Sequence, residues 1–337
     1  MKWFVTKIVE GQMLREKRVG KAFASSNIAL CKYWGKRDAS LNLPINSSLS
    51  VSLGSLGTQT KISVSEKAVD EVWLNGVLQK VDSDFAKRVS NFLDPFRPHV
   101  GNVFFTVHTE NNIPTAAGLA SSASGFAALV LALHDWAGWT LTRRDLSMLA
   151  RLGSGSASRS IFNGFVQWNA GTREDGMDSF AEPLPVEWND FRVGVLEISD
   201  QEKRVGSRDG MARTVKTSAL YKVWPNQAQE DLTTIRTAIE TRDFNQLGKT
   251  AERNALTMHA TMMASSPPLL YFLPETIKQI HHVHQLRKEG LELYLTIDAG
   301  PNLKLLFQKK DQQMVKEQFP TLQIIAPFSS VLITSNH

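Results

Sequence analysis

The sequence predicts an α+β fold in two domains. Segments with strand-like alternation and segments with helical spacing are mixed along the chain without a regular strand–helix–strand repeat, which favours α+β. The length of 337 residues suggests two domains or one large one. Residues 169–188 are rich in turn-forming and charged residues, with Pro183 and Pro185 close together. We therefore expect an N-terminal domain at 1–187 and a C-terminal domain at 188–337.

Several segments of the first half have strand patterns. Leu49 to Leu53 alternates strictly between apolar and polar residues, which predicts a half-buried strand. Asn75-Gly76 lies between apolar pairs and predicts a hairpin turn. A capping box at Thr142 to Asp145 predicts the start of a helix. The remaining expected strands are at 21–30, 58–65, 102–109 and 164–168, and the remaining expected helices at 82–93 and 125–137.

The second half has longer helical segments. Helical spacing covers 206–224 and 229–263, with a break near Arg242-Asp243, and continues at 274–290. Strands are expected at 192–199, 291–297, 302–307 and 322–325, with a short helix at 311–319.

Composition narrows the classes of function. Hydrophobic residues make up 42% and charged residues 21% of the chain, as in an ordinary globular protein. The net charge of +5 comes from scattered residues, so nucleic-acid binding is not favoured. The single Cys31 excludes an intrachain disulfide and suits a reducing compartment. Residues 1–18 lack the apolar core of a signal peptide, and the apolar run at 126–133 is too short to cross a bilayer. We expect a cytoplasmic protein that makes no use of a membrane.

The loop between Asn111 and Gly125 has the composition of a phosphate-binding loop. It combines small residues with the hydroxyls of Ser121 and Ser122, where the following helix should begin. A helix start offers unpaired N–H groups and a positive dipole end, which suit an anion. The alternative is an ordinary N-cap before a small-residue helix. Neither a P-loop nor a dinucleotide-binding fingerprint is present.

Three other segments combine cations or hydroxyls with glycine. Residues 32–38 place two lysines and an arginine around two aromatics, and residues 151–160 surround Arg159 with serines. Residues 205–211 again place glycine, a hydroxyl and an arginine before a helix. Each suits a phosphate or carboxylate. In residues 151–160 a helix beginning at Ser156 would also direct its dipole at the anion. The alternatives for the three segments are, in order, a solvated turn, a flexible link between helices and a capped helix start.

Asp298 ends an apolar strand just before a Gly-Pro turn. Such a carboxylate is a candidate base, although Asp before Gly often only caps its own turn. His281, His282 and His284 lack a carboxylate or cysteine partner at ligand spacing, so we interpret them as surface residues, and Cys31 as a packed small residue. Residue chemistry alone thus indicates a phosphoryl-binding enzyme of unknown reaction.

Taken together, these segments resemble the diphosphomevalonate decarboxylase family of the GHMP kinase superfamily, which includes galactokinase, homoserine kinase and mevalonate kinase. The match runs in order from about residue 21 to 305, and the Lys-Tyr-Trp-Gly-Lys and Asp-Ala-Gly-Pro-Asn pieces are specific to the decarboxylases. The kinases usually have Gly-Leu-Gly-Ser-Ser where this chain has Gly-Leu-Ala-Ser-Ser. The matching segments are 27–38, 43–51, 112–123, 153–160, 207–211 and 298–302.

The resemblance implies a reaction. The family converts mevalonate 5-diphosphate, ATP and Mg²⁺ to isopentenyl diphosphate, CO₂, ADP and phosphate, by phosphorylating the 3-hydroxyl before CO₂ leaves. The implied catalytic residues are Asp298, at the 3-hydroxyl, Arg159, at the substrate carboxylate, and Asn27, in support. The other implied substrate-binding residues are Tyr33, Lys36, Ser154, Ser156, Ser207, Arg208 and Met211. The implied ATP-binding residues are Pro114, Ala117, Gly118, Leu119, Ala120, Ser121 and Ser122, of which the two serines would also bind Mg²⁺.

The resemblance also implies an architecture. The N-terminal domain would be ribosomal-protein-S5-like and the C-terminal domain ferredoxin-like, with the active site in the cleft between them, in a homodimer. Two alternatives within the fold are a phosphomevalonate decarboxylase and a mevalonate-type kinase that stops after phosphorylation. A further alternative is a non-catalytic anion-binding protein. Because Lys36, Ser207, Arg208 and Asp298 are all present, the diphosphate substrate and full decarboxylation are favoured.

Overall fold

A computed structural model describes residues 1–113, 121–201 and 204–328 and has the predicted mixed α+β architecture. The N-terminal half is built on a seven-stranded sheet in the order β6-β5-β7-β4-β8-β9, with β1 also paired to β4. All of its pairings are antiparallel except β5 with β7. Its strands are β1 (Gly20–Cys31), β4 (Ser48–Val64), β5 (Glu71–Leu74), β6 (Val77–Leu78), β7 (Phe105–Asn111), β8 (Phe165–Trp168) and β9 (Ala181–Pro183).

Strand β4 organises this sheet. The sequence predicts two strands, at 49–53 and 58–65, but the structure joins them into one strand of 17 residues. Its first part pairs with β8 and its second part with β7, while β1 runs antiparallel to it on the other side. The predicted Asn75-Gly76 turn is confirmed, since both residues have positive φ (48° and 80°) between β5 and β6.

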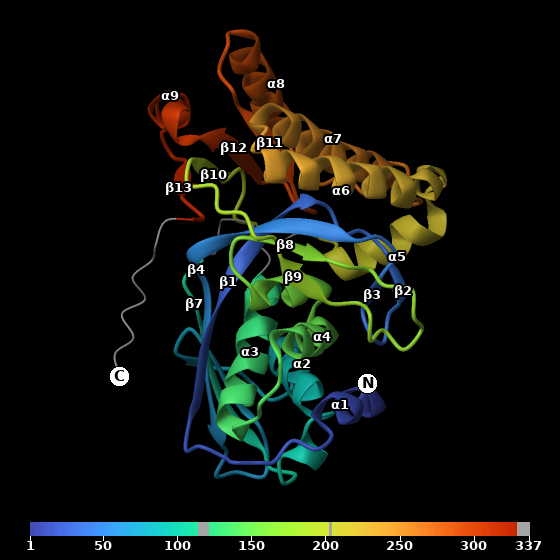
Figure 1. The fold of residues 1–337 in the computed structure, drawn as a ribbon, viewed down its shortest axis with the longest axis vertical. Helices are drawn as coiled ribbons and strands as arrows, with labels where there is room; N and C mark the ends of the chain where they lie inside the picture. The colour runs from blue at the N-terminus through green and yellow to red at the C-terminus, as the bar shows by residue number, and fades with distance from the viewer. Residues whose placement is uncertain (114–120, 202–203, 329–337) are drawn as a thin grey trace.

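Helices cover one face of this sheet (Figure 1). They are α1 (Lys2–Val9), α2 (Asp84–Leu93), α3 (Ser121–Ala137) and α4 (Arg143–Gly153), with a 3₁₀ helix at Arg97–His99. The capping box at Thr142 is confirmed. Helix α1 was not predicted from the sequence, yet Phe4 and Val5 are fully buried in the core beneath the sheet.

The C-terminal half has a four-stranded sheet in the order β11-β12-β10-β13 with helices against it. The predicted break near Arg242 is confirmed: Arg242 ends one helix with a positive φ of 56°, and Asp243 caps the next. No helix in the described part of the chain is long and apolar enough to cross a membrane. The elements are β10 (Phe191–Leu196), α5 (Ser207–Thr217), α6 (Trp224–Thr241), α7 (Phe244–Met263), α8 (Pro274–Lys288), β11 (Tyr294–Ile297), β12 (Leu303–Gln308), α9 (Gln312–Gln318) and β13 (Gln323–Ile325), with 3₁₀ helices at Ala219–Val223 and Lys309–Asp311.

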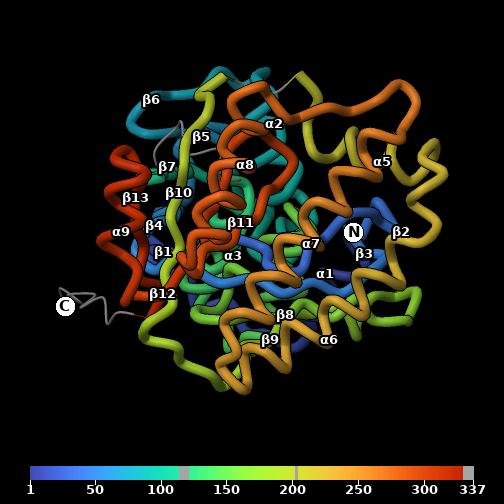
Figure 2. Tube along the Cα trace, turned by 90° about the horizontal axis from the view of Figure 1, so that it is seen from above, coloured from blue at the N-terminus to red at the C-terminus, as the bar shows by residue number. Residues whose placement is uncertain are grey.

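The two halves share a core. Helices α6 and α7 lie side by side over the face of β1 and β4 that α3 leaves open (Figures 1 and 2), and their apolar residues form one cluster with these strands. The strands are therefore covered on both faces. For this reason the expectation of a half-buried strand at 49–53 is wrong: Ser48, Ser50 and Ser52 are as buried as the apolar residues between them.

A small two-stranded sheet, β2 (Lys36–Asp38) with β3 (Leu43–Pro44), directly follows Gly35. Gly35 has a φ of +113°, and a Cβ there would lie 1.8 Å from the hydroxyl oxygen of Tyr221. That hydroxyl donates to the main-chain oxygen of Trp34 at 2.7 Å. Glycine is thus required by both the backbone conformation and the close approach.

We expect Gly35→Ala to lower the free energy of unfolding by about 2–5 kcal/mol, from backbone strain plus overpacking. Urea denaturation of Gly35→Ala and Gly290→Ala measures this. Gly290 is a matched control because its φ is +103° but no atom lies within 4 Å of the added Cβ. Gly290→Ala should lose only the part of the unfolding free energy that comes from backbone strain. Equal losses in Gly35→Ala and Gly290→Ala would contradict the role of the Tyr221 contact.

Candidate active site

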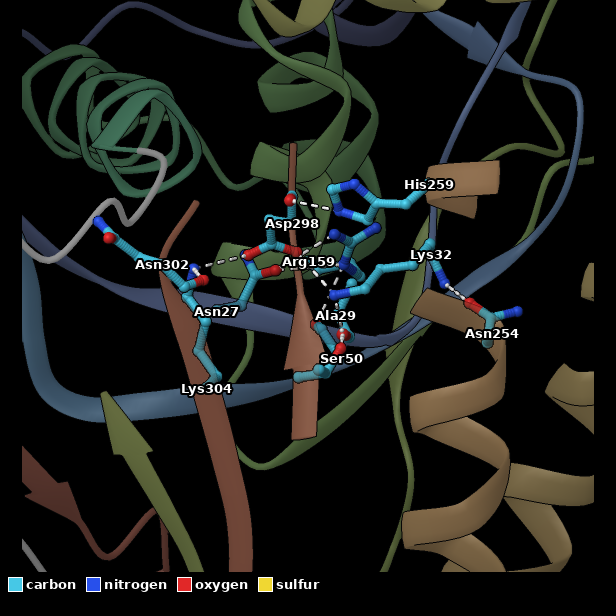
Figure 3. A network of polar contacts seen from close by, with 11 residues as sticks. Asn27, Ala29, Lys32, Ser50, Arg159, Asn254, His259, Asp298, Asn302 and Lys304 are labelled. Carbon is cyan, nitrogen blue, oxygen red and sulfur yellow. Dashed lines mark hydrogen bonds and ion pairs between the residues drawn. The ribbon is translucent and has the colours of Figure 1, made fainter. Parts of the chain in front are cut away.

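The predicted catalytic residues come from both halves of the chain and lie together at one place (Figure 3). Asn27 lies on β1, Arg159 lies on the 3₁₀ helix Gly155–Ile161, and Asp298 follows β11. The Asn27 amide oxygen accepts from Arg159 Nε and Nη2 at 3.3 and 3.2 Å. The Asn27 amide nitrogen donates to Ser160 Oγ at 2.8 Å. Asn27 therefore fixes the orientation of the guanidinium.

Arg159 is buried and held on several sides. Its Nη1 donates to Ser48 Oγ at 2.6 Å and its Nε to Ser50 Oγ at 3.0 Å. Desolvation lowers its pKa to about 10, opposed by Asp298 and Tyr33, so the group stays charged at neutral pH. Its contacts with other described residues engage Nε and one hydrogen on each Nη. A guanidinium carries five N–H groups, so one on each Nη remains for a carboxylate.

Two lysines flank Asp298: Lys32, which the sequence placed only in a general anion-binding segment, and Lys304, which sequence reasoning missed. Lys32 Nζ lies 2.7 Å from Asp298 Oδ1, and Lys304 Nζ lies 3.6 Å from Oδ2. Both lysine side chains are 2% exposed, whereas that of Asp298 is 34% exposed. The carboxylate is therefore accessible to a substrate, with the ammonium groups behind it. Burial lowers the pKa of Lys32, and Asp298 opposes this shift.

The sequence contained a signal for both lysines. Lys304 is the one charged residue in the apolar run of β12, and Lys32 stands between Cys31 and two aromatics. A lysine within a buried run needs a counter-charge. Nothing in the sequence, however, indicated that the counter-charge was Asp298.

The serine-rich segment 153–160 differs from its prediction. Instead of a helix beginning at Ser156, the structure has a buried 3₁₀ helix, Gly155–Ile161. Gly155 is needed less for a free backbone than for packing, since a Cβ there would meet Trp168 and Tyr33 at 2.8–2.9 Å. The serine hydroxyls form a chain: Ser154 Oγ lies 3.4 Å from Ser122 Oγ and 3.3 Å from Ser156 Oγ. This chain joins the start of α3 to the surroundings of Arg159.

A second group of predicted residues lies beside Trp34 and α5. The Tyr33 ring packs edge-on against Trp168 at 4.8 Å, and its hydroxyl is buried with no hydrogen-bond partner among the described residues. Met211 is buried in the same cluster as Trp34. Ser207 and Arg208 form the first turn of α5.

This second group is cationic. Lys36 Nζ donates to Asn42 Oδ1 at 2.5 Å, and burial together with the nearby Arg208 lowers the pKa of Lys36 to about 8. Burial and Arg208 also lower the pKa of Arg88, on α2, which sequence reasoning did not select. Cations that repel one another favour a polyanionic ligand.

The predicted nucleotide loop is only partly described. Pro114, Ala117, Gly118, Leu119 and Ala120 lie outside the described residues. Ser121 and Ser122 begin α3, as predicted.

The sequence analysis interprets Cys31 as a packed small residue and His281, His282 and His284 as surface residues. Cys31 is buried, and burial raises the pKa of its thiol above the usual range. His284 pairs with Glu252 at 3.0 Å, and His281 is exposed. Within residues 1–113, 121–201 and 204–328, no group of three or more His, Cys, Asp or Glu side chains could hold a metal ion.

Two family models match the chain in succession. The diphosphomevalonate decarboxylase-like N-terminal domain matches residues 24–181, and the mevalonate 5-diphosphate decarboxylase C-terminal domain matches residues 193–330. The chain belongs to the diphosphomevalonate decarboxylase family. The N-terminal model contains Asn27 and Arg159, and the C-terminal model contains Asp298, so the site is assembled from both.

The similarity to known relatives extends over most of this chain and most of theirs. Diphosphomevalonate decarboxylase mvd1 of Aspergillus fumigatus is 42% identical over 87% of this chain and 77% of its own. The Saccharomyces cerevisiae diphosphomevalonate decarboxylase is 38% identical over 86% and 78%. A solved mevalonate diphosphate decarboxylase of Staphylococcus aureus has a TM-score of 0.87 at 39% identity, covering 92% of this chain and 95% of that one. MDDEF, solved in complex with MVAPP, AMPPCP and magnesium, has a TM-score of 0.86 at 43% identity, covering 92% and 97%.

ATP and Mg²⁺ fit the residues that are described. Mg²⁺ in phosphate-transferring enzymes is bound by one or two protein groups plus substrate phosphates and water. The chain supplies hydroxyls at the start of α3, Ser121 and Ser122, and no carboxylate cage in its described part. Such a site depends on ATP itself for most of the metal's ligands.

Proposed function

We propose that this chain catalyses the ATP-dependent decarboxylation of mevalonate 5-diphosphate to isopentenyl diphosphate, CO₂, ADP and phosphate. The observation that carries the proposal is the meeting of Arg159, Asp298 and Lys32 beside a separate cationic group. Arg159 suits the substrate carboxylate, and the cationic group suits the diphosphate at the other end of the same small molecule. The ATP phosphates and Mg²⁺ would lie at the start of α3, bound by Ser121 and Ser122.

Each residue then has a role at a stated atom. Asp298 orients or deprotonates the 3-hydroxyl, and Lys32 holds Asp298 in place from behind. Arg159 binds the substrate carboxylate with one N–H on each Nη, supported by Asn27 and with Ser154 and Ser156 nearby. Tyr33, Lys36, Ser207 and Arg208 bind the diphosphate, with Met211 against it.

Positioning and charge supply the catalysis. Phosphoryl transfer needs the hydroxyl in line with the terminal phosphate and compensation of the developing charge. Bound ATP supplies the phosphoryl group that turns the tertiary hydroxyl into a leaving group. Arg159 fixes the carboxylate in a buried position, so loss of CO₂ takes place in surroundings that do not solvate it.

The substrate diphosphate should bind more weakly at alkaline pH. The pKa of Lys36 is lowered to about 8, so its charge is present below that pH and is lost above it. We expect the KM for mevalonate 5-diphosphate to rise on the order of fivefold between pH 8 and 9, as for a single titrating group. Steady-state kinetics over this range measures it. In Lys36→Arg the guanidinium stays charged, so the rise should disappear; an identical rise in that variant would exclude Lys36 as its source.

Product analysis tests the function itself. The protein is incubated with ATP, Mg²⁺ and carboxyl-labelled mevalonate 5-diphosphate, and released CO₂ is counted against ADP. One CO₂ per ADP is expected. ADP without CO₂ would make the protein a kinase, and a preference for mevalonate 5-phosphate would make it a phosphomevalonate decarboxylase. Absence of both products would favour a non-catalytic anion-binding protein.

Three further features belong to the same proposal. The protein forms a homodimer, as the family resemblance implies. It is located in the cytoplasm, which the single cysteine suits, and its domain boundary lies between residues 187 and 188. Sedimentation equilibrium tests the first: a mass of one chain at micromolar concentration would rule out the dimer.

A further inference from the structure

One helix contacts the main chain on both sides of the Lys32–Asp298 ion pair. Lys32 follows β1 and Asp298 follows β11, and the two residues are 266 positions apart. From α7, Asn254 Oδ1 accepts the main-chain N–H of Lys32 at 2.7 Å, and His259 Nε2 lies 3.0 Å from the main-chain oxygen of Asp298 (Figure 3). Both side chains are buried. Neither has a role in the reaction proposed above.

The Asn254 amide is held in one orientation. Its nitrogen donates to Asp231 Oδ2 at 2.9 Å, and Asp231 is a fully buried carboxylate of α6. Arg253 and Gln227 also donate to Asp231. Turning the amide over would bring its NH₂ against the Lys32 N–H and its oxygen against the carboxylate, so Oδ1 has to face Lys32. On its other side, Lys32 is held through its main-chain oxygen by Asn46 at 2.8 Å.

His259 acts on Asp298 as a neutral donor. A carbonyl oxygen only accepts, so the proton lies on Nε2. Burial lowers the pKa of His259 to about 3, although the hydrogen bond to the main chain of Asp298 acts to raise it. Of the nearby charged groups, Lys32 and Lys304 lower this pKa further, and the Asp298 carboxylate raises it. The ring stacks on Phe272 at 4.3 Å. A neutral imidazole with its proton on Nε2 can hold the main-chain oxygen of Asp298.

We propose that Asn254 and His259 are positioning residues that hold Lys32 and Asp298 in register for the decarboxylation proposed above. The 2.7 Å ion pair joins two segments from opposite halves of the chain, and α7 is bonded to the main chain of both. A misplacement of about 1 Å at a reacting group costs about 100-fold in rate. Because α7 holds the main chain at both Lys32 and Asp298, it limits the misplacement of these two groups relative to each other.

The first test uses two substitutions of His259 that differ in one donor. His259→Phe keeps the ring against Phe272 but removes the N–H, whereas the amide of His259→Gln can still donate to the Asp298 carbonyl. We expect kcat to fall about 10- to 100-fold in His259→Phe, with a KM for mevalonate 5-diphosphate within about threefold of wild type because the diphosphate site is separate. His259→Gln should recover most of the rate.

The pH profile separates positioning from acid–base chemistry. The acid limb of the kcat profile should be the same in His259→Gln as in wild type, since a neutral His259 contributes no titration to it. A shifted limb, or equal losses of kcat in the Phe and Gln variants, would overturn the proposal. Wild-type CO₂ release is measured alongside, so absence of activity in the wild type would refute the proposed function, which is a distinct outcome.

The second test asks whether Asn254 acts through Lys32. Asn254→Ala is combined with Lys32→Met, and the rates of both single variants and the double variant are compared. If Asn254 only positions Lys32, its substitution should add less than about threefold once Lys32 is gone. Losses that multiply would overturn its role. Thermal unfolding checks that the variants fold; should Asn254→Ala fail to fold, the His259 pair decides the proposal.

Discussion

Replacing Asp298 by Asn should abolish nearly all turnover. The substitution keeps the size of the side chain but removes the anion 2.7 Å from Lys32 and 3.6 Å from Lys304, both of which are buried. Loss of a positioned base or orienting group costs typically 10²–10⁴-fold, and here the two lysines also lose their counter-charge. We expect kcat to fall about 10³-fold, or about 4 kcal/mol of barrier. The measurement is ADP and CO₂ formation under single-turnover conditions.

The two products should fall together, because phosphorylation of the hydroxyl precedes loss of CO₂. ADP formation that persists while CO₂ is lost would contradict a role of Asp298 at the hydroxyl. Asp190→Asn is a suitable control because Asp190 is an exposed carboxylate of the C-terminal half. The rate of Asp190→Asn should stay within about twofold of wild type. If kcat of Asp298→Asn were less than tenfold lower than that of wild type, the assignment would likewise be refuted.

Replacing Arg159 by Lys should also be severe, although the charge is conserved. The guanidinium donates to Ser48, Ser50 and Asn27 at once, and an ammonium cannot reproduce this planar set of donors. Removing one partner of a buried hydrogen-bonded charge pair costs roughly 2–5 kcal/mol. We therefore expect kcat/KM for mevalonate 5-diphosphate to fall about 30-fold or more, while the KM for ATP changes little.

Arg192→Lys provides a matched control for this experiment. Arg192 is also a buried arginine, on β10, but it donates to the main-chain oxygens of Asn189 and Phe191 and to Gln312. Its substitution should lower the thermal stability and leave kcat/KM within a few-fold. If both lysine variants lost kcat/KM equally, the effect at Arg159 would be one of stability rather than of substrate binding.

Local patterns in the sequence were sufficient to predict the turns and helix ends that depend on a few neighbouring residues. The Asn75-Gly76 turn, the Thr142 capping box and the break at Arg242 were predicted because each depends on a few neighbouring residues. The same holds for Ser121 and Ser122 at the start of α3. Asn27, Arg159 and Asp298 were selected because the segments that carry them resemble a known family, and the structure brings the three side chains together.

Only the tertiary structure decided which of the buried polar groups belong to the site. Alternation at 49–53 suggested a solvent-facing row of serines opposite an apolar face. The apolar face is covered by α6 and α7, while Ser48 and Ser50, on the other face, are covered as well and contact Arg159. Lys32 was visible as a lysine among apolar residues, yet its partner lies 266 positions away. Residue types therefore determined which chemistry the chain carries, while its geometry followed from packing α7 against β1 and β11, because a buried charge is stable only where the fold supplies its counter-charge.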